Sequence, residues 1–132
     1  MLGKRKKRRP TKVNSLIGKD STILGNVEFT GGLHVDGVIK GNVNALGDEK
    51  ATLTLSDRGT IEGEVRVSHI ILNGVVNGDV YAREYVELSS RARVEGNVFY
   101  GLIEMAMGAE VNGQLVRIAE EERSPMELDE ST

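Results

Sequence analysis

Few residues of this chain could take part in acid–base, nucleophilic or metal chemistry. The 132 residues include two histidines, His34 and His69, and no cysteine, so disulfides, thiolate metal ligands and cysteine nucleophiles are excluded. Each histidine lies beside a segment of alternating apolar residues, where an exposed position explains it better than a catalytic role does. We find no carboxylate pair, metal-ligand spacing, phosphate loop or Ser-His-Asp arrangement. The sequence therefore predicts a protein that is not an enzyme, with no cofactor, metal or small-molecule substrate.

The charged residues are divided unevenly along the chain. Residues 1–12 carry seven Lys or Arg and no acid, whereas residues 119–132 carry six acids and one Arg. Both ends are too poor in apolar residues to bury a core of their own. We therefore predict a disordered basic arm over residues 1–13, one folded domain over 14–118 and a disordered acidic tail over 119–132. The tail could recruit a basic partner or serve only to keep the chain soluble.

The basic arm has three possible interpretations. It could bind anionic lipid, at roughly 1 kcal/mol for each basic residue near the surface. It could also be a passive solvated tail, or it could bind nucleic acid, although the rest of the chain lacks a basic face with interleaved aromatics. We favour the membrane, because two apolar residues directly precede the basic run. The predicted membrane-targeting residues are Met1, Leu2, Lys4, Arg5, Lys6, Lys7, Arg8 and Arg9.

The folded domain is built from repeats of about 17 residues. A Gly-x-Val or Gly-x-Leu motif recurs at intervals of 16, 22, 15, 18 and 17 residues. Its glycines are Gly25, Gly41, Gly63, Gly78, Gly96 and Gly113. Two residues before them stand the β-branched residues Ile23, Ile39, Ile61, Val76, Val94 and Val111. Farther upstream are apolar pairs at i and i+2: Leu33 and Val35, Leu53 and Leu55, Ile70 and Leu72, Val86 and Leu88, and Ile103 and Met105.

Each repeat holds three short segments of alternating apolar residues, and this pattern predicts strands separated by turns. Three strands of five to six residues go once around a triangular solenoid, whose coils stack at roughly 4.8 Å in parallel pairing. Six coils would make a rod roughly 29 Å long. The six glycines are then structural, since they lie at or near tight corners. The long interval of 22 residues is explained by a loop, "LGDEKAT", over residues 46–52.

Neither end of the predicted solenoid has an amphipathic segment that could cap it. The first and last coils would present unpaired strand edges and apolar side chains, and such ends tend to stack on one another. The predicted polymer interface therefore consists of residues in these two coils: Leu16, Ile17, Ile23, Val27, Leu115, Val116 and Ile118.

Two other functions are compatible with a solenoid. Left-handed β-helices of acyltransferase-like enzymes are one, but they follow a strict six-residue repeat, from which units of 15 to 22 residues depart. A monomeric module that binds membrane or nucleic acid is the other.

Three segments of the repeats are characteristic: "GLHVDGVIKGNV" (32–43), "VSHIILNGVVNGDVYA" (67–82) and "VELSSRARVEGNVFYGLIEMAMGAEVNGQL" (86–115). Through them, residues 14–118 resemble the bactofilins, a family of bacterial cytoskeletal proteins. This resemblance implies a single-domain, right-handed parallel β-helix with flexible ends. It also implies self-assembly, end to end and without nucleotide, into non-polar filaments. The expected location is the cytoplasm, often at the inner face of the cytoplasmic membrane, with cell-wall or morphogenetic proteins as possible partners. The opening "MLGKRKK" is similar to membrane-targeting segments of some members.

Overall fold

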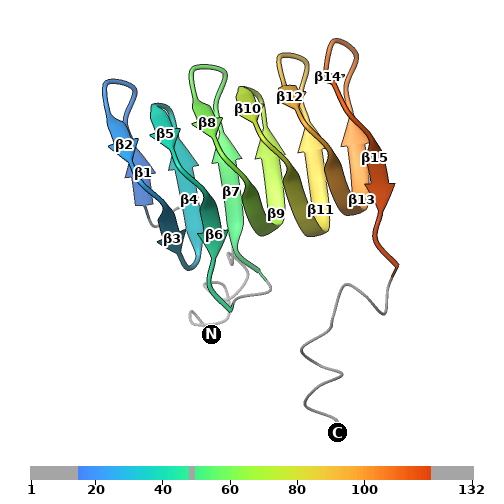
Figure 1. Cartoon of the computed structure of the whole chain (residues 1–132), viewed down its shortest axis with the longest axis horizontal. Helices are drawn as coiled ribbons and strands as arrows, with labels where there is room; N and C mark the ends of the chain where they lie inside the picture. Colours follow the sequence, from blue (N-terminus) through green and yellow to red (C-terminus); the bar gives the residue numbers. More distant parts are fainter. Residues whose placement is uncertain (1–14, 48–49, 120–132) are drawn as a thin grey trace, which may run out of the picture.

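A computed structural model describes residues 15–47 and 50–119, and these residues form fifteen β-strands and no helix. The strands wind around a rod, and successive coils follow one another in sequence order (Figure 1). Their bounds are β1 (Ser15–Ile17), β2 (Thr22–Leu24), β3 (Val27–Phe29), β4 (Gly32–Val35), β5 (Val38–Lys40), β6 (Val43–Ala45), β7 (Thr52–Leu55), β8 (Thr60–Glu62), β9 (Val65–Leu72), β10 (Val75–Asn77), β11 (Val80–Leu88), β12 (Arg93–Glu95), β13 (Val98–Met105), β14 (Glu110–Val111) and β15 (Leu115–Arg117). Since no described residue is helical, none of them belongs to a membrane-spanning helix.

Each coil has three faces, and the described residues make six coils. Face 1 consists of β1, β4, β7 and the second halves of β9, β11 and β13; face 2 consists of β2, β5, β8, β10, β12 and β14. Face 3 consists of β3, β6, the first halves of β9, β11 and β13, and β15. Strands of neighbouring coils pair in parallel throughout. The predicted all-β parallel solenoid of about six coils is therefore confirmed.

The inward side chains form columns along the rod. On face 2 the column contains the six β-branched residues of the repeat, Ile23, Ile39, Ile61, Val76, Val94 and Val111, in direct register. On face 3 the residue two after each glycine forms a second column: Val27, Val43, Val65, Val80, Val98 and Leu115. The upstream apolar pairs form two further columns on face 1. Small aliphatic side chains suit this core, because opposite faces of a thin solenoid lie close together.

The three corners of the coils are built differently. Between faces 1 and 2, coils 1, 3, 5 and 6 have two-residue turns, whereas coils 2 and 4 have the short Asp36–Gly37 and Asn73–Gly74 links. The turns lie over Lys19–Asp20, Asp57–Arg58, Ser90–Arg91 and Met107–Gly108. These turns are closed by backbone hydrogen bonds such as that from Gly59 N to Ser56 O, 3.0 Å or shorter in most cases. Between faces 3 and 1, β9, β11 and β13 continue without a break. β6 instead ends at Ala45, and the chain leaves the coil before re-entering it at β7. The predicted loop lies here; its residues 48–49 lie outside the described ranges.

Glycines line the corner between faces 2 and 3 because successive coils touch there. A Cβ atom on Gly41, Gly63, Gly78, Gly96 or Gly113 would collide with the carbonyl oxygen of the equivalent glycine in the preceding coil. Gly25 belongs to the first coil, and a Cβ atom on it would meet nothing within 4 Å. Its φ of 132° nevertheless favours glycine.

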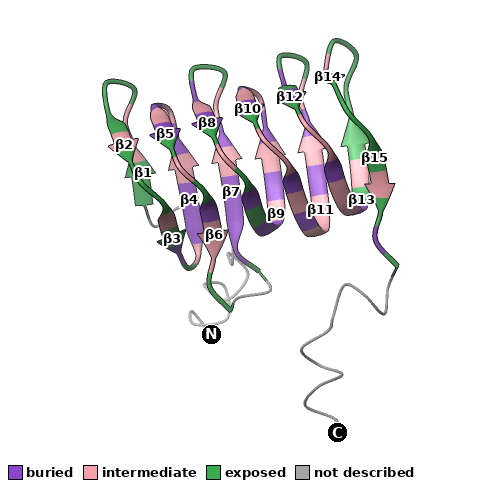
Figure 2. Cartoon of the chain, in the orientation of Figure 1, coloured by how far each residue is buried: buried purple, intermediate pink, exposed green. Residues whose placement is uncertain are grey.

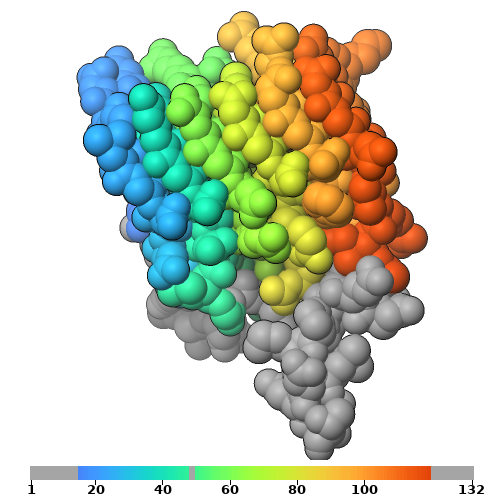
Figure 3. Space-filling view, in the orientation of Figure 1, coloured from blue at the N-terminus to red at the C-terminus, as the bar shows by residue number. Residues whose placement is uncertain are grey.

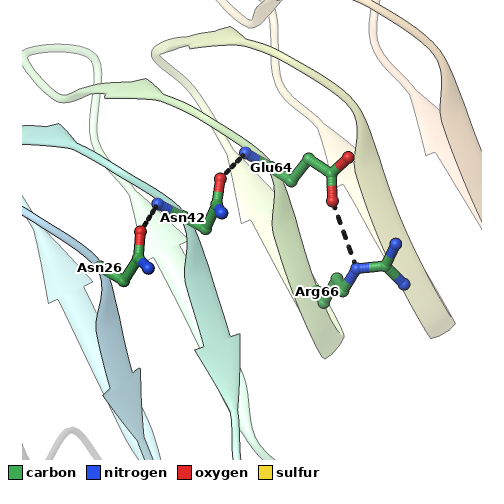
Figure 4. Close-up of polar contacts among 4 residues, drawn as sticks. All are labelled: Asn26, Asn42, Glu64 and Arg66. Carbon is green, nitrogen blue, oxygen red and sulfur yellow. Dashed lines mark hydrogen bonds and ion pairs between the residues drawn. The ribbon is translucent and has the colours of Figure 1, made fainter.

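Polar side chains reinforce the same corner from outside. The backbone N–H of Asn42 donates to Oδ1 of Asn26 (2.8 Å), and that of Glu64 donates to Oδ1 of Asn42 (2.9 Å), as Figure 4 shows. The pattern resumes two coils later, with Asn97 N donating to Asp79 Oδ1 and Gln114 N to Asn97 Oδ1, both at 2.9 Å. Glu64 interrupts it, because its carboxylate turns to Nε of Arg66 instead (3.4 Å). Each bond ties one coil to the next at a corner that has no strand pairing.

Candidate assembly surfaces

Exposure of the core columns changes sharply at the two ends of the rod. In the face 2 column, Ile39, Ile61, Val76 and Val94 have no exposed area, whereas the terminal members Ile23 and Val111 are only partly buried. The face 3 column behaves in the same way: Val43 to Val98 are fully buried, Val27 is partly buried and Leu115 is 45% exposed. Figure 2 shows buried segments concentrated in the middle coils and exposed segments at both ends. The apolar cross-section of the solenoid is thus open at both ends of the described structure.

The remaining exposed apolar side chains lie in the same two coils. Seven large hydrophobic residues are classed as exposed among the described residues, and six of them belong to coil 1 or coil 6. They are Leu16 and Leu24 in coil 1, and Leu102, Met105, Met107 and Leu115 in coil 6. The exception is Leu46, in the loop after β6. The space-filling view shows the coils as adjacent bands in sequence order, so that the first and last bands form the ends of the rod (Figure 3).

Strand edges are open at these ends as well. In the described part of the chain, β1, β2 and β3 each pair with one strand, in coil 2. The second half of β13, β14 and β15 likewise each pair with one strand, in coil 5. Strands elsewhere in the rod have neighbours on both sides, apart from the interrupted corner after β6. An unpaired edge beside an apolar cross-section is a surface on which another strand can add.

The predicted interface residues do not all face the ends. Ile17, Ile23 and Val27 occupy inward columns of coil 1, and Leu115 occupies one of coil 6. Leu16 alternates with Ile17 and therefore lies on the outside of face 1, in register with His34. Val116 likewise lies outside face 3, beside Phe99. Adjacent residues of a strand point to opposite faces of the sheet, so Leu16 and Ile17, which were both predicted in the interface, point in opposite directions.

Ile118 requires a correction. We expected it in an exposed terminal face, but only 4% of it is exposed. Its backbone N–H donates to Tyr100 O at 2.7 Å, so the chain keeps its pairing with coil 5 beyond the end of β15. Leu24, Leu102 and Met107 are 79%, 59% and 88% exposed, but they are not among the predicted interface residues. Their signal was present: each is a large apolar residue in a terminal repeat but outside the inward columns.

An acidic group lies near the C-terminal end of face 1. Glu87 and Glu104 are in register on neighbouring strands, and the Tyr85 hydroxyl donates to Glu104 Oε1 at 2.7 Å and to Glu87 Oε1 at 3.3 Å. The hydrogen bond to Glu104, followed by partial desolvation and the charge of Glu87, raises the pKa of Tyr85 well above its usual value. The neutral phenol thus donates toward two carboxylates on neighbouring strands.

The histidines form no catalytic arrangement with other described residues. Nε2 of His34 lies 3.0 Å from Oδ1 of Asp36. A hydrogen bond from Ser56, together with the contact with His34, lowers the pKa of Asp36. Nδ1 of His69 is buried without a hydrogen-bond partner. No group of three or more potential metal ligands occurs within residues 15–47 and 50–119. The predicted membrane-targeting residues, Met1 to Arg9, lie outside these ranges.

Comparison with known proteins gives consistent matches along the solenoid. A family model described as bactofilin, polymer-forming cytoskeletal, matches residues 15–116. Two Myxococcus xanthus (strain DK1622) proteins, Bactofilin BacO and Bactofilin BacP, are each 28% identical over 102 residues, or 77% of this chain. These alignments cover 78% of BacO and 41% of BacP.

Two solved structures are similar as well. One is the solid-state NMR structure of the cytoskeletal bactofilin BacA, with 31% identity and a TM-score of 0.70 over 83% of this chain. The other is a cryo-EM reconstruction of Thermus thermophilus bactofilin double helical filaments, with 28% identity and a TM-score of 0.66 over 80% of this chain. Both comparisons cover the whole of the other chain.

Proposed function

Because this chain belongs to the bactofilin family of polymer-forming cytoskeletal proteins, we propose that its copies join end to end through their first and last coils. Assembly needs no nucleotide or other cofactor, since the contact is apolar and extends the pairing of strands. The filament is a scaffold at the inner face of the cytoplasmic membrane, where the basic arm contacts anionic lipid. Cell-shape or cell-wall proteins are its partners.

The observation that carries this proposal is the distribution of exposed apolar side chains. Six of the seven exposed large hydrophobic residues of the described structure lie in the two terminal coils, beside open strand edges. A solenoid that remains a monomer covers such ends with a polar or helical cap. Stacking of two ends buries Leu115 and its counterparts and provides new partners for the strand edges.

We further propose that the filament is non-polar, as the family resemblance implies. Like ends then meet: the first coil of one copy contacts the first coil of the next, and the last coils contact each other. Each of these two contacts has two-fold symmetry, so any residue in it meets its own counterpart nearby. A single substitution that introduces a charge therefore places two like charges in each contact.

The test is Leu115→Arg, with Leu46→Arg as the matched control. The two leucines are similarly exposed, at 45% and 48%, but Leu46 lies in the loop after β6 of coil 2, four coils away from Leu115. Leu115→Arg places like charges in every contact between last coils, where desolvation makes them costly. In a non-polar filament it should stop growth at dimers joined through their first coils, whereas Leu46→Arg should still form filaments. Electron microscopy and light scattering with mass determination measure both outcomes.

The alternatives give different masses. If subunits stacked head to tail, Leu115→Arg would leave monomers, because every contact would contain one altered face. Filaments as long as those of the wild type would show that the last coil is not an assembly surface. Thermal unfolding of Leu115→Arg, compared with that of Leu46→Arg, distinguishes a loss of assembly from a loss of folding.

A further inference from the structure

A cavity of about 330 Å³ opens on the outside of the rod where face 3 turns into face 1. It arises because β6 ends at Ala45 and the chain departs into a loop, while β9 and β11 continue around the corner. Nine residues of the described part of the chain line the cavity, among them Arg66, Arg83 and Tyr81, and none of these nine is acidic. The described lining is therefore cationic, on a folded domain that has an excess of acids.

The two arginines are arranged to receive carboxylates. The Cζ atom of Arg66 lies 5.1 Å from the centre of the Tyr81 ring, and Tyr81 stacks on Phe99 with ring centres 5.7 Å apart. Arg66 is also in contact with Glu64, but only through Nε, in an exposed pair at 3.4 Å (Figure 4). Arg83 makes no ion pair with any described residue. A guanidinium that lies over an aromatic ring can still offer its planar donors to a carboxylate.

The acidic tail begins within reach of this cavity. Val67, which lines the cavity, shares one row with Ala82, Tyr100 and Arg117, so Arg117 lies three coils away. At about 4.8 Å per coil, that separation is roughly 14 Å. Ile118 still pairs with Tyr100 of coil 5, so the chain can turn along the rod only from Ala119. Glu120 to Glu122 follow Ala119 by one to three residues, and an extended chain of that length spans roughly 3–11 Å. Arg83 follows Ala82, which is two coils from Arg117, or roughly 10 Å.

From the charge complementarity and this reach, we propose that the Glu120–Glu122 run binds in the cavity of its own chain. Its carboxylates pair with the guanidinium groups of Arg66 and Arg83. The start of the tail is then held along the side of the rod, rather than in front of the last coil. This inference concerns the single chain and does not depend on how copies assemble.

The test is a distance measurement between two spin labels. The chain has no cysteine, so Ser124→Cys and Glu28→Cys provide two unique sites. Glu28 lies on the outside of face 3, in register with the cavity residue Asn44, and Ser124 follows the acidic run. Labelled protein is diluted into excess unlabelled protein, so that only pairs within one chain are measured. We expect a short, narrow distance distribution, which becomes long and broad in Arg66→Gln with Arg83→Gln.

Two matched controls have the same changes in charge. Arg91→Gln with Arg93→Gln removes two arginines outside the cavity, and it should leave the distribution narrow. In the tail, Glu120→Gln, Glu121→Gln and Glu122→Gln together should broaden it, whereas Glu127→Gln, Asp129→Asn and Glu130→Gln together should not. Thermal unfolding verifies that each variant is folded, and Arg83→Glu with Glu121→Arg should restore the narrow distribution that either change alone disturbs.

Three results would overturn the proposal. The first is a broad distribution in the wild type, or one that the cavity variants do not change. The second is equal broadening by the variants and their matched controls, since that would reflect net charge alone. The third is a short distance that disappears on dilution, because the tail would then bind a neighbouring copy.

Discussion

The carbonyl oxygen of Gly25 occupies the space that a Cβ atom on Gly41 would need. The same relationship joins Gly41 to Gly63 and continues through Gly78 and Gly96 to Gly113. The backbones of successive coils therefore touch along one corner. Glycine is needed in the Gly-x-Val motif because the carbonyl oxygen of the preceding coil leaves no room for a side chain.

This contact makes Gly41→Ala destabilising. The added methyl group would push against backbone, which cannot move aside as a flexible side chain can, so we expect a loss of roughly 1–3 kcal/mol or more in the free energy of unfolding. Gly18→Ala is the control, because a Cβ atom there meets nothing within 4 Å. Its effect should be within about 0.5 kcal/mol. Denaturant titration compares the two, and similar midpoints would contradict the account of the corner.

The inward columns give a second prediction. Val76 has no exposed area, so Val76→Asp would place a carboxylate without a partner among aliphatic side chains, at a cost of several kcal/mol. We expect this variant to unfold or aggregate. Val75→Asp changes the preceding residue, whose side chain points outward and lies in register with Arg93. Circular dichroism and denaturant titration should show that it remains folded. Equal stability of the two variants would contradict the assignment of Val76 to an inward column.

Deletion of residues 1–9 should separate membrane binding from assembly. If the arm binds by apolar insertion and charge, the truncated chain should no longer co-sediment with anionic vesicles but should still form filaments. Binding of the full chain should weaken steeply with salt, since salt screens exposed charges. Both proteins must be polymerised in the assay, because a filament multiplies weak contacts. Equal co-sedimentation with and without the arm would exclude its role at the membrane.

Tyr85 predicts a dependence of stability on alkaline pH. Its pKa is raised in the folded chain by Glu104 and Glu87, so the folded state retains a proton that the unfolded chain loses above the usual tyrosine pKa, near 10. Stability from this group is complete below that pH and falls as pH rises toward the folded-state pKa. The wild type should therefore lose stability more steeply above pH ~10 than Tyr85→Phe, by a few tenths of a kcal/mol per pH unit, because water screens surface charges.

The control for this experiment keeps the phenol and removes its acceptor. Glu104→Gln leaves Tyr85 in place but takes away the carboxylate that accepts its hydrogen bond at 2.7 Å. The alkaline slope of the free energy of unfolding should then approach that of Tyr85→Phe. If Glu104→Gln kept the slope of the wild type, this carboxylate would not control the proton of Tyr85.

The columns could be predicted from sequence because every coil repeats the same constraint. A β-branched residue two places before a glycine, as at Val76 and Gly78, fixes both the inward direction and the corner. What could not be predicted depends on contacts without a repeated signal. Leu16 points outward because of its register with β4, and the chain still pairs with coil 5 at Ile118, past the last motif. The cavity beside Arg66 and Arg83 exists only because one coil leaves the rod at Ala45 while the next two do not.

The glycine corner also makes the length of the rod a multiple of one unit. At this corner the backbone of each coil meets that of the coil before it, and equivalent positions from Gly41 to Gly113 do so in the same way. Duplication of one internal unit, such as the residues from Gly63 to Asn77, would insert a coil without altering either end. Each such duplication in evolution would lengthen the axial repeat of the polymer by about 4.8 Å per subunit. The length of the subunit can thus change by whole coils, while the surfaces that meet between subunits stay the same.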